Sequence, residues 1–277
     1  MSNYSNGEAA TRTNETIRFS FGANWRKYLR ELDTERIHQA EAALQRSFGS
    51  ASLTGQRFID IGCGSGLSSL CAERLGAAEI VSIDIDPESI ACANALRRTV
   101  EENANWRVLR GSILDREFLK TITPAARVYS WGALHHTGAM WEAVDNAISL
   151  VEPGGLFCLA LYNRPRALAI QMALKRLYNR TPRSLRRILV GAYGGTLLSV
   201  LLVKGHRNPV QYVTQYGRRS RGMSFWRDVE DWLGGLPFEY TSYKEVRRIA
   251  ARRGCVVEQV LNGPPGANNE YLLRRPG

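Results

Sequence analysis

Cysteine is scarce in this chain and is not arranged for metal binding or cross-linking. The 277 residues include five cysteines, and no two of them form a CxxC pair. That spacing argues against a zinc site and against a disulfide framework, so we expect no metal. At least four of the five lie in apolar segments, where buried, reduced thiols are expected. Reduced thiols suit a cytoplasmic location.

Long hydrophobic runs are also missing. Residues 1–16 are polar and small, so we expect a disordered tail and no signal peptide. The longest apolar run, 188–203, has 16 residues, whereas a membrane-spanning helix needs roughly 18–20. Two interpretations stay open: a helix packed on the protein, or a helix at a membrane interface with peripheral contact through 183–207. Basic residues flank the run, namely Arg186, Arg187, Lys204 and Arg207.

Acidic side chains are absent from one long segment. Residues 153–227 hold fourteen of the 37 lysines and arginines and none of the 26 aspartates and glutamates. The net charge of +11 therefore arises from this segment. A local positive field favours an anionic neighbour, and a solvated helical surface is the other interpretation.

Glycines, in contrast, are concentrated where a ligand would need them. Residues 58–66 read FIDIGCGSG, a buried strand followed by a loop with Gly62, Gly64 and Gly66. Glycine permits positive φ and close approach of a ligand to the backbone, and the helix that follows presents free N–H groups. The next apolar strand ends at Asp84, which is placed to accept hydrogen bonds from two ribose hydroxyls.

The spacing GxGxG differs from the GxGxxG of dinucleotide enzymes, and its context is more informative. Asp60 lies inside the strand, and a buried carboxylate needs partners, which could be the loop N–H groups or a ligand's ammonium group. Together with SIDIDP at 82–87, SWGALHH at 130–136 and VEPGG at 151–155, this pattern resembles the class I S-adenosylmethionine-dependent methyltransferases. The resemblance covers 55–162. Within the family, the chain is similar to the quinone-methylase-like, small-molecule branch. A Rossmann-type domain for another nucleotide is the alternative.

The resemblance implies that S-adenosylmethionine is the cofactor and S-adenosylhomocysteine the product. In this family the loop after the third strand contacts the adenine and often carries an acid at the position of Ser112. Because Ser112 has no carboxylate, we expect the adenine amino group to donate to Asp115 or to a backbone carbonyl. Phe21 and Trp25 are expected either near the methionine end or as anchors of an N-terminal helix over 26–48. The implied cofactor contacts are Asp60, Gly62, Cys63, Gly64, Gly66, Asp84, Ile85, Ser112, Ile113 and Trp131.

Five apolar strands alternate with helical segments, which predicts an α/β fold with a parallel, doubly wound sheet. They lie at 57–61, 79–84, 106–110, 127–131 and 156–162, and two more follow at 255–261 and 270–274. The resemblance implies a Rossmann-like seven-stranded sheet whose last strand is antiparallel. We expect four parts: a tail and cap helix (1–50), a cofactor-binding core (51–162), a large, basic helical lid inserted after strand five (163–240), and a C-terminal helix with closing strands (241–277).

The candidate base follows strand four, in the segment that contains His135 and His136. A histidine whose pKa lies near neutrality can remove a proton from an acceptor. Similar small-molecule methyltransferases often have a histidine where His136 stands, so we expect His136, in preference to His135, to be the base. The alternative is a histidine that caps the next helix or holds the loop.

Motifs for several acceptor classes are missing from the same segment. There is no [DNS]PP[YFW] motif of nucleic-acid amino methylation, no Pro-Cys pair of cytosine C5 enzymes, and no glutamate pair of protein arginine methyltransferases. We therefore expect a small-molecule acceptor, methylated at oxygen or nitrogen, and no DNA partner. The basic lid fits an anionic or lipid-linked acceptor. The expected acceptor-binding residues are Tyr162, Trp226, Tyr240 and Asn269.

Two other functions stay open. An RNA methyltransferase would use the basic insertion to hold phosphates. A non-enzymatic protein of the same fold would sense the cofactor or act as a scaffold, although the intact glycine loop and Asp84 argue against it.

Overall fold

The computed structural model describes residues 19, 21–100, 105–203 and 208–277. The predicted tail at 1–16 and the flanking residues Lys204 and Arg207 lie outside the described residues. All five cysteines are buried and free, as predicted.

Seven strands form one mixed sheet in the order β3-β2-β1-β4-β5-β7-β6. The first five pair in parallel, and β7 runs antiparallel between β5 and β6, which confirms the predicted Rossmann-like fold. The strands are β1 (Arg57–Ile61), β2 (Glu79–Asp84), β3 (Trp106–Arg110), β4 (Ala125–Trp131), β5 (Val151–Tyr162), β6 (Val256–Leu261) and β7 (Asn268–Arg274).

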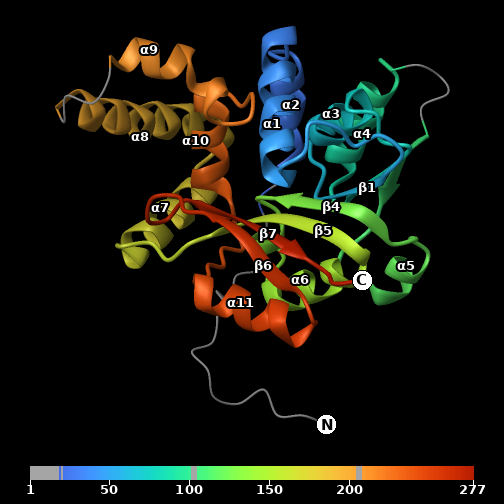
Figure 1. Ribbon diagram of the computed structural model, residues 1–277. Helices are drawn as coiled ribbons and strands as arrows, with labels where there is room; N and C mark the ends of the chain where they lie inside the picture. The colour runs from blue at the N-terminus through green and yellow to red at the C-terminus, as the bar shows by residue number, and fades with distance from the viewer. Residues whose placement is uncertain (1–18, 20, 101–104, 204–207) are drawn as a thin grey trace.

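Helices cover both faces of the sheet and bury its apolar side chains (Figure 1). On one face lie α1 (Gly22–Leu29), α2 (Thr34–Phe48), α3 (Leu67–Arg74) and α4 (Pro87–Arg97). On the other lie α5 (Arg116–Lys120), α6 (Met140–Ser149) and α11 (Tyr243–Arg252). The core therefore consists of two layers, one on each side of the strands.

The N-terminal helical region differs from the single helix expected over 26–48. It is divided into α1 and α2, because the side chain of Asp33 caps α2 by accepting a hydrogen bond from Arg36 N at 2.8 Å. An aspartate at this position satisfies a free N–H group of the first turn, so a new helix begins there.

The insertion after β5 is helical, as expected, and contains more elements than the sequence indicated. It comprises α7 (Leu168–Arg180), α8 (Arg183–Val203), α9 (Pro209–Thr214), the 3-10 turn η2 (Tyr216–Arg218) and α10 (Phe225–Gly234). In Figure 1, α8 and α9 lie together at one end of the molecule, and α7 and α10 connect them to the body.

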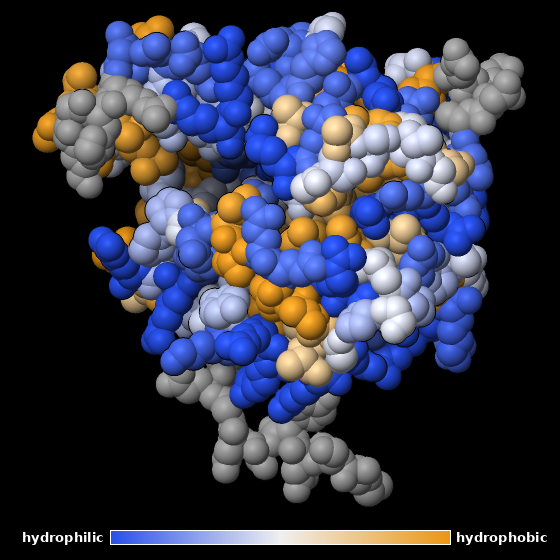
Figure 2. Space-filling model, in the orientation of Figure 1, coloured by the Kyte–Doolittle hydropathy of each residue, from blue (hydrophilic) through white to orange (hydrophobic). Residues whose placement is uncertain are grey.

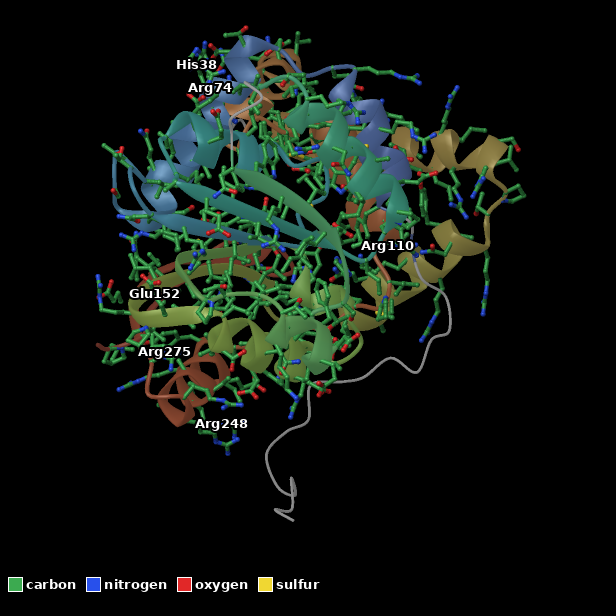
Figure 3. The ribbon with its side chains drawn as sticks, turned by 90° about the vertical axis from the view of Figure 1, so that its right-hand side faces the viewer. His38, Arg74, Arg110, Glu152, Arg248 and Arg275 are labelled. Carbon is green, nitrogen blue, oxygen red and sulfur yellow. The ribbon has the colours of Figure 1, made fainter. Side chains whose placement is uncertain are left out.

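The carboxyl ends of the parallel strands face this insertion. Figure 3 shows Arg110, the last residue of β3, on the side of the insertion, whereas Glu152 near the start of β5 lies at the opposite edge. Two ion pairs fasten α10 to the N-terminal segment: Lys27 with Glu230 at 3.0 Å, and Arg227 with Glu31 at 2.7 Å. The N-terminal cap and the insertion thus close over the same edge of the sheet.

Candidate active site

The glycine loop after β1 is packed too closely for side chains. Gly62 and Gly64 have positive φ values of 70° and 54°. A Cβ atom on Gly62 would lie 2.3 Å from Cβ of Ala133, and one on Gly64 would lie 2.6 Å from the Trp25 ring. The loop therefore contacts both the segment after β4 and the N-terminal helix, which only glycine permits in this backbone conformation.

Asp84 ends β2 and orders the glycine loop from the neighbouring strand. Its Oδ2 accepts a hydrogen bond from Gly64 N at 3.0 Å, and its Oδ1 accepts one from Asp86 N at 2.9 Å. Burial raises the pKa of the Asp84 carboxyl, and these backbone donors oppose that shift. The carboxylate has lone pairs left for a ligand, since each oxygen can accept more than one hydrogen bond.

Asp60 lies beneath the loop and is paired with hydroxyl groups. It accepts a hydrogen bond from Ser69 Oγ at 2.8 Å, and Ser69 in turn contacts Ser82 Oγ at 2.6 Å. Burial raises the pKa of Asp60 to about 7, and the nearby charge of Asp84 adds to the shift. The partner expected from the sequence was a loop N–H group or a ligand ammonium, and the partner found is Ser69.

A cavity of about 590 Å³, here called the cofactor cavity, opens at the ends of β1, β2, β3 and β4. Six of the ten expected cofactor contacts line it: Gly62, Asp84, Ile85, Ser112, Ile113 and Trp131. Asp60 and Cys63 instead line a small space of about 50 Å³ behind the loop. Gly64 and Gly66 line neither space and shape the turn through their positive φ angles.

The side chains after β3 are already engaged with the backbone. Ser112 Oγ accepts a hydrogen bond from Leu114 N at 3.1 Å. Asp115 caps α5 by accepting from Glu117 N and Phe118 N, both at 3.1 Å, and it does not line the cofactor cavity. Of the two expected partners for an adenine amino group, a backbone carbonyl therefore fits better than Asp115.

The N-terminal aromatic residues lie at the cofactor cavity. Phe21 and Trp25 line the cofactor cavity, and the Phe21 ring lies 4.9 Å from that of His136. The same segment is anchored to α4, since Gly22 N donates to Asp86 Oδ2 at 3.1 Å.

His136 is partly buried in the 3-10 turn Leu134–His136 that follows β4. Its Nδ1 lies 2.7 Å from the carbonyl oxygen of Pro237. Because a carbonyl only accepts, Nδ1 must carry the proton, and the lone pair is left on Nε2. Burial lowers the pKa of His136 to about 3, and the charge of Lys175 contributes to that shift. The imidazole is therefore neutral at physiological pH.

His135 is fully buried and has a structural role. Its Nδ1 accepts a hydrogen bond from Tyr162 N at 3.3 Å, and its carbonyl oxygen accepts one from Glu239 N at 3.0 Å. Burial places the pKa of His135 well below the usual value. It does not line the cofactor cavity, whereas His136 does.

A second cavity, of about 650 Å³, lies between the strand ends and the insertion and is here called the lid cavity. It adjoins the cofactor cavity through five residues that line both: Phe21, Trp25, Trp131, Gly132 and His136. Aromatic side chains from β5, α8, η2 and α10 form part of its other walls, namely Tyr162, Tyr193, Tyr216 and Trp232. The turn between β6 and β7 closes it at 263–268.

One of the four expected acceptor residues, Tyr162, lines the lid cavity. The other three lie outside its lining. Trp226 packs its ring against Gly194 of α8, Tyr240 packs against Phe238, and Asn269 accepts hydrogen bonds from Asn163 Nδ2 and Gly263 N at 2.9 and 3.0 Å. These three side chains support the walls of the cavity without forming them.

Sequence reasoning missed several charged and polar residues that line the lid cavity. Asp228 Oδ2 accepts a hydrogen bond from Tyr216 Oη at 2.9 Å, and burial raises the Asp228 pKa to about 6. Asp231 Oδ1 accepts one from Asn24 Nδ2 at 3.0 Å, and burial holds the Asp231 pKa well above its usual value. The available signal was their position, because they are two of the first three acids after the acid-free segment.

Arg221 is the other missed residue. It has a φ of 51°, and its guanidinium lies over the Trp131 ring, 3.1 Å from the ring centroid. It makes no hydrogen bond or ion pair with any residue that the structure describes. Arg221 lines the lid cavity beside Asp228, and its guanidinium can bind an anionic group there.

Lys175 is fully buried beside the lid cavity. Its Nζ donates to the carbonyl oxygen of Trp232 and lies 5.7, 5.0 and 4.9 Å from the ring centroids of Tyr162, Trp232 and Phe238. Burial lowers the pKa of Lys175 to about 7, and the charge of Asp231 opposes that shift. Cation–π contacts stabilise the charged ammonium form, but they offset only part of the effect of burial on the Lys175 pKa.

This environment predicts a pH-dependent stability. Between about pH 7 and the ordinary lysine pKa of 10.5 the unfolded state binds more protons at this position, so the free energy of unfolding rises with pH. Replacing Lys175 with methionine should flatten that rise, by an amount on the order of several kcal/mol. Urea unfolding of both proteins across this range measures the difference. Parallel curves would mean that Lys175 titrates normally in the folded protein.

A match to a known protein family identifies the kind of protein to which this site belongs. The family model described as a methyltransferase domain matches residues 32–260. The chain belongs to this family. Among the residues that the structure describes, no group of three or more His, Cys, Asp or Glu side chains is placed to hold a metal.

Curated relatives of this methyltransferase cover part of the chain. A ribosomal protein L11 methyltransferase of Aliivibrio salmonicida is 45% identical over 129 residues, which is 40% of this chain and 43% of the relative. One of Vibrio cholerae is 40% identical over 67 residues, or 24% of this chain and 23% of the relative. The chain thus spans less than half the length of these relatives.

Solved structures show the same fold at low identity. The magnesium protoporphyrin IX methyltransferase of Synechocystis with bound S-adenosylhomocysteine has a TM-score of 0.55 and 14% identity, over 91% of this chain and 93% of that one. A Haloferax volcanii methyltransferase complexed with the Trm112 activator has a TM-score of 0.55 and 12% identity, over 95% and 100% of the two chains.

The chain is a methyltransferase by family, and the solved structures that share its fold include a Synechocystis enzyme with bound S-adenosylhomocysteine and with bound S-adenosylmethionine. The residues present fit S-adenosylmethionine. A volume of about 590 Å³ lies within the roughly 300–1,000 Å³ of small-molecule sites. Asp84 offers a carboxylate for a ribose diol, and Ile85 and Ile113 offer apolar walls for a flat base.

Proposed function

We propose that this methyltransferase methylates an oxygen or nitrogen atom of a small molecule bound in the lid cavity. The observation that carries this proposal is the junction of the two cavities at Trp131, Gly132 and His136. The cofactor supplies an electrophilic methyl group on a good leaving group. What the chain must add is position, exclusion of water and removal of a proton.

In the proposed cofactor site, Asp84 holds the ribose, while Ile85, Ser112 and Ile113 surround the adenine. Trp131 and Gly62 border the methionine part, and the loop Cys63–Gly66 with Asp60 beneath it keeps the turn in shape. The insertion acts as the lid over the acceptor.

His136 is the proposed proton acceptor. Methylation of a hydroxyl oxygen would leave that oxygen positively charged and strongly acidic. Nε2 of His136 carries a free lone pair, because Nδ1 donates to Pro237. A base whose pKa is about 3 is weak, yet it can take the proton from an oxonium, which is a much stronger acid.

The lid cavity also indicates the character of the acceptor. Buried polar atoms that lack a partner need an explanation. Three such atoms, Gln171 Nε2, Trp131 Nε1 and Asn268 Oδ1, belong to residues that line this cavity. Together with the aromatic walls and the available Arg221 guanidinium, they favour an acceptor with an apolar or flat body and a polar, anionic end.

A transfer experiment tests the acceptor class. A cell extract is incubated with the protein and with cofactor that carries a tritium-labelled methyl group, then separated into small-molecule, protein and RNA fractions. Label should enter the small-molecule fraction, and His136→Ala should abolish most of it. Label confined to RNA would support the basic insertion as a phosphate-binding surface instead.

A protein acceptor is the second candidate, because the relatives named above are ribosomal protein L11 methyltransferases. In the same experiment it predicts label in the protein fraction and none in the small-molecule fraction. That result would overturn the small-molecule proposal.

A further inference from the structure

Helix α8 is apolar along most of its length but is hardly buried. Gly194 is its only buried residue, and because it has no side chain the Trp226 ring packs closely against it. The large exposed side chains include Ile188, Leu202 and Val203, with 65%, 61% and 86% of their surface accessible. Figure 2 shows hydrophobic surface at this end of the molecule. Contiguous exposed apolar surface of this kind marks an interaction site.

The helix is longer than the apolar run, because the basic turn that begins at Arg183 joins the run and gives 21 residues. Within the described part of the chain, α8 is the one helix long and apolar enough to cross a membrane, by length and composition. It is held in the protein by its contacts with α9 and α10, a geometry that suits a helix lying on a bilayer better than one spanning it.

The charges around α8 indicate which kind of partner it binds. Arg180, Arg183 and Arg187 are exposed at the N-terminal end of the helix and make no ion pair with a described residue. No acidic residue occurs anywhere in 153–227. A surface that combines apolar side chains with unpaired arginines, and has no acids, matches anionic lipid headgroups above an acyl layer.

The apolar surface continues into the lid cavity. Tyr193 and Leu197 of α8 line that cavity, and Leu197 is also 37% exposed. The neighbouring Val200 is exposed as well. An acceptor with an acyl or prenyl chain could therefore pass from a bilayer to His136 along one side of α8.

We propose that α8 docks on an anionic lipid bilayer and that the acceptor enters the lid cavity from that bilayer. The entry route rests on the proposed function, whereas the docking does not. A bilayer at this surface would cover the exposed leucine, isoleucine and valine side chains and neutralise the three arginines. The acceptor would then be a membrane-resident, amphipathic molecule.

Vesicle sedimentation of the full chain tests the docking. Binding to vesicles of phosphatidylcholine mixed with phosphatidylglycerol should exceed binding to phosphatidylcholine alone by about tenfold or more, and salt should weaken it. The double variant Ile188→Glu/Val203→Glu should lose about tenfold or more of this binding. Arg183→Gln/Arg187→Gln should lose a similar factor on anionic vesicles only, because each arginine near the surface contributes to binding.

The matched control is Val256→Glu/Leu261→Glu. These residues of the edge strand β6 are 57% and 47% exposed and lie outside the insertion, so vesicle binding should be unchanged. All variants should keep normal affinity for S-adenosylmethionine, measured without vesicles, which separates loss of docking from loss of the active site.

Several outcomes would overturn the proposal. One is no binding to either kind of vesicle. Another is binding that the α8 substitutions do not alter. A third is a dimer in solution that the same substitutions dissociate, because α8 would then be covered by a second copy. If label enters no small molecule while vesicle binding stays intact, the docking stands and the acceptor assignment fails.

Discussion

Replacement of Asp84 by alanine should weaken the binding of S-adenosylmethionine by about 10²-fold or more. A hydrogen bond to a charged group contributes about 1.5–3 kcal/mol, and about 1.4 kcal/mol corresponds to a factor of ten. The Asp84 carboxylate is proposed to accept two such bonds from the ribose. It also accepts from Gly64 N and Asp86 N, so the variant loses loop order as well. Calorimetric titration gives the two dissociation constants.

Two variants make this prediction specific. Asp84→Asn keeps the shape of the side chain but loses its charge, so its affinity should fall between those of the wild type and Asp84→Ala. Asp115→Ala removes a carboxylate that caps α5 outside the cofactor cavity, and its cofactor affinity should stay normal. If Asp84→Ala folds and binds as tightly as the wild type, Asp84 does not hold the ribose.

Substitution of His136 by alanine should lower turnover by about 10²-fold or more while cofactor affinity changes little. The basis is geometric, because His136 borders both cavities and presents an unprotonated Nε2. The measurement is kcat with saturating acceptor and cofactor. His38→Ala is the matched control, since His38 is an exposed histidine of α2 that pairs with Glu41 and lines neither cavity.

The pH profile provides a second readout for His136. The pKa of about 3 lies below the usual histidine value of 6.5, so the neutral form persists as the pH falls towards 4. Turnover should therefore show no loss near pH 6.5 from protonation of this imidazole. A wild-type profile that falls at pH 6.5, and loses that feature in His136→Ala, would contradict the proposed environment. Normal turnover of His136→Ala would remove it from the mechanism.

The regular part of the fold could be predicted closely from the sequence. β1, β2 and β3 have the predicted bounds, because each is a short apolar run that ends in turn residues. The break between α1 and α2 was missed because the helical pattern continues across it, and Asp33 decides the boundary by capping. Helix α10 was not assigned, although Phe225, Val229 and Leu233 recur at helical spacing and are buried.

The two halves of the site differed in how well they could be predicted. The cofactor side follows from short motifs at the ends of strands, where parallel topology brings them together. The lid cavity depends on how α7, α8 and α10 pack, so Gln171 and Arg221 carried no local signal, and Asp228 was marked only by its position after the acid-free segment. Trp226 and Asn269 were expected to contact the acceptor. Instead, Trp226 packs against Gly194, and Asn269 accepts a hydrogen bond from the β6–β7 turn.

A crystal structure with bound S-adenosylhomocysteine would locate the nucleoside and the reacting sulfur together. The ribose hydroxyls should lie on Asp84 and the base beside Ile85 and Ile113. The sulfur should lie at the junction formed by Trp131, Gly132 and His136, facing the lid cavity. A sulfur that faces away from the lid cavity, or a nucleoside bound elsewhere, would contradict both the cofactor site and the proposed place of the acceptor.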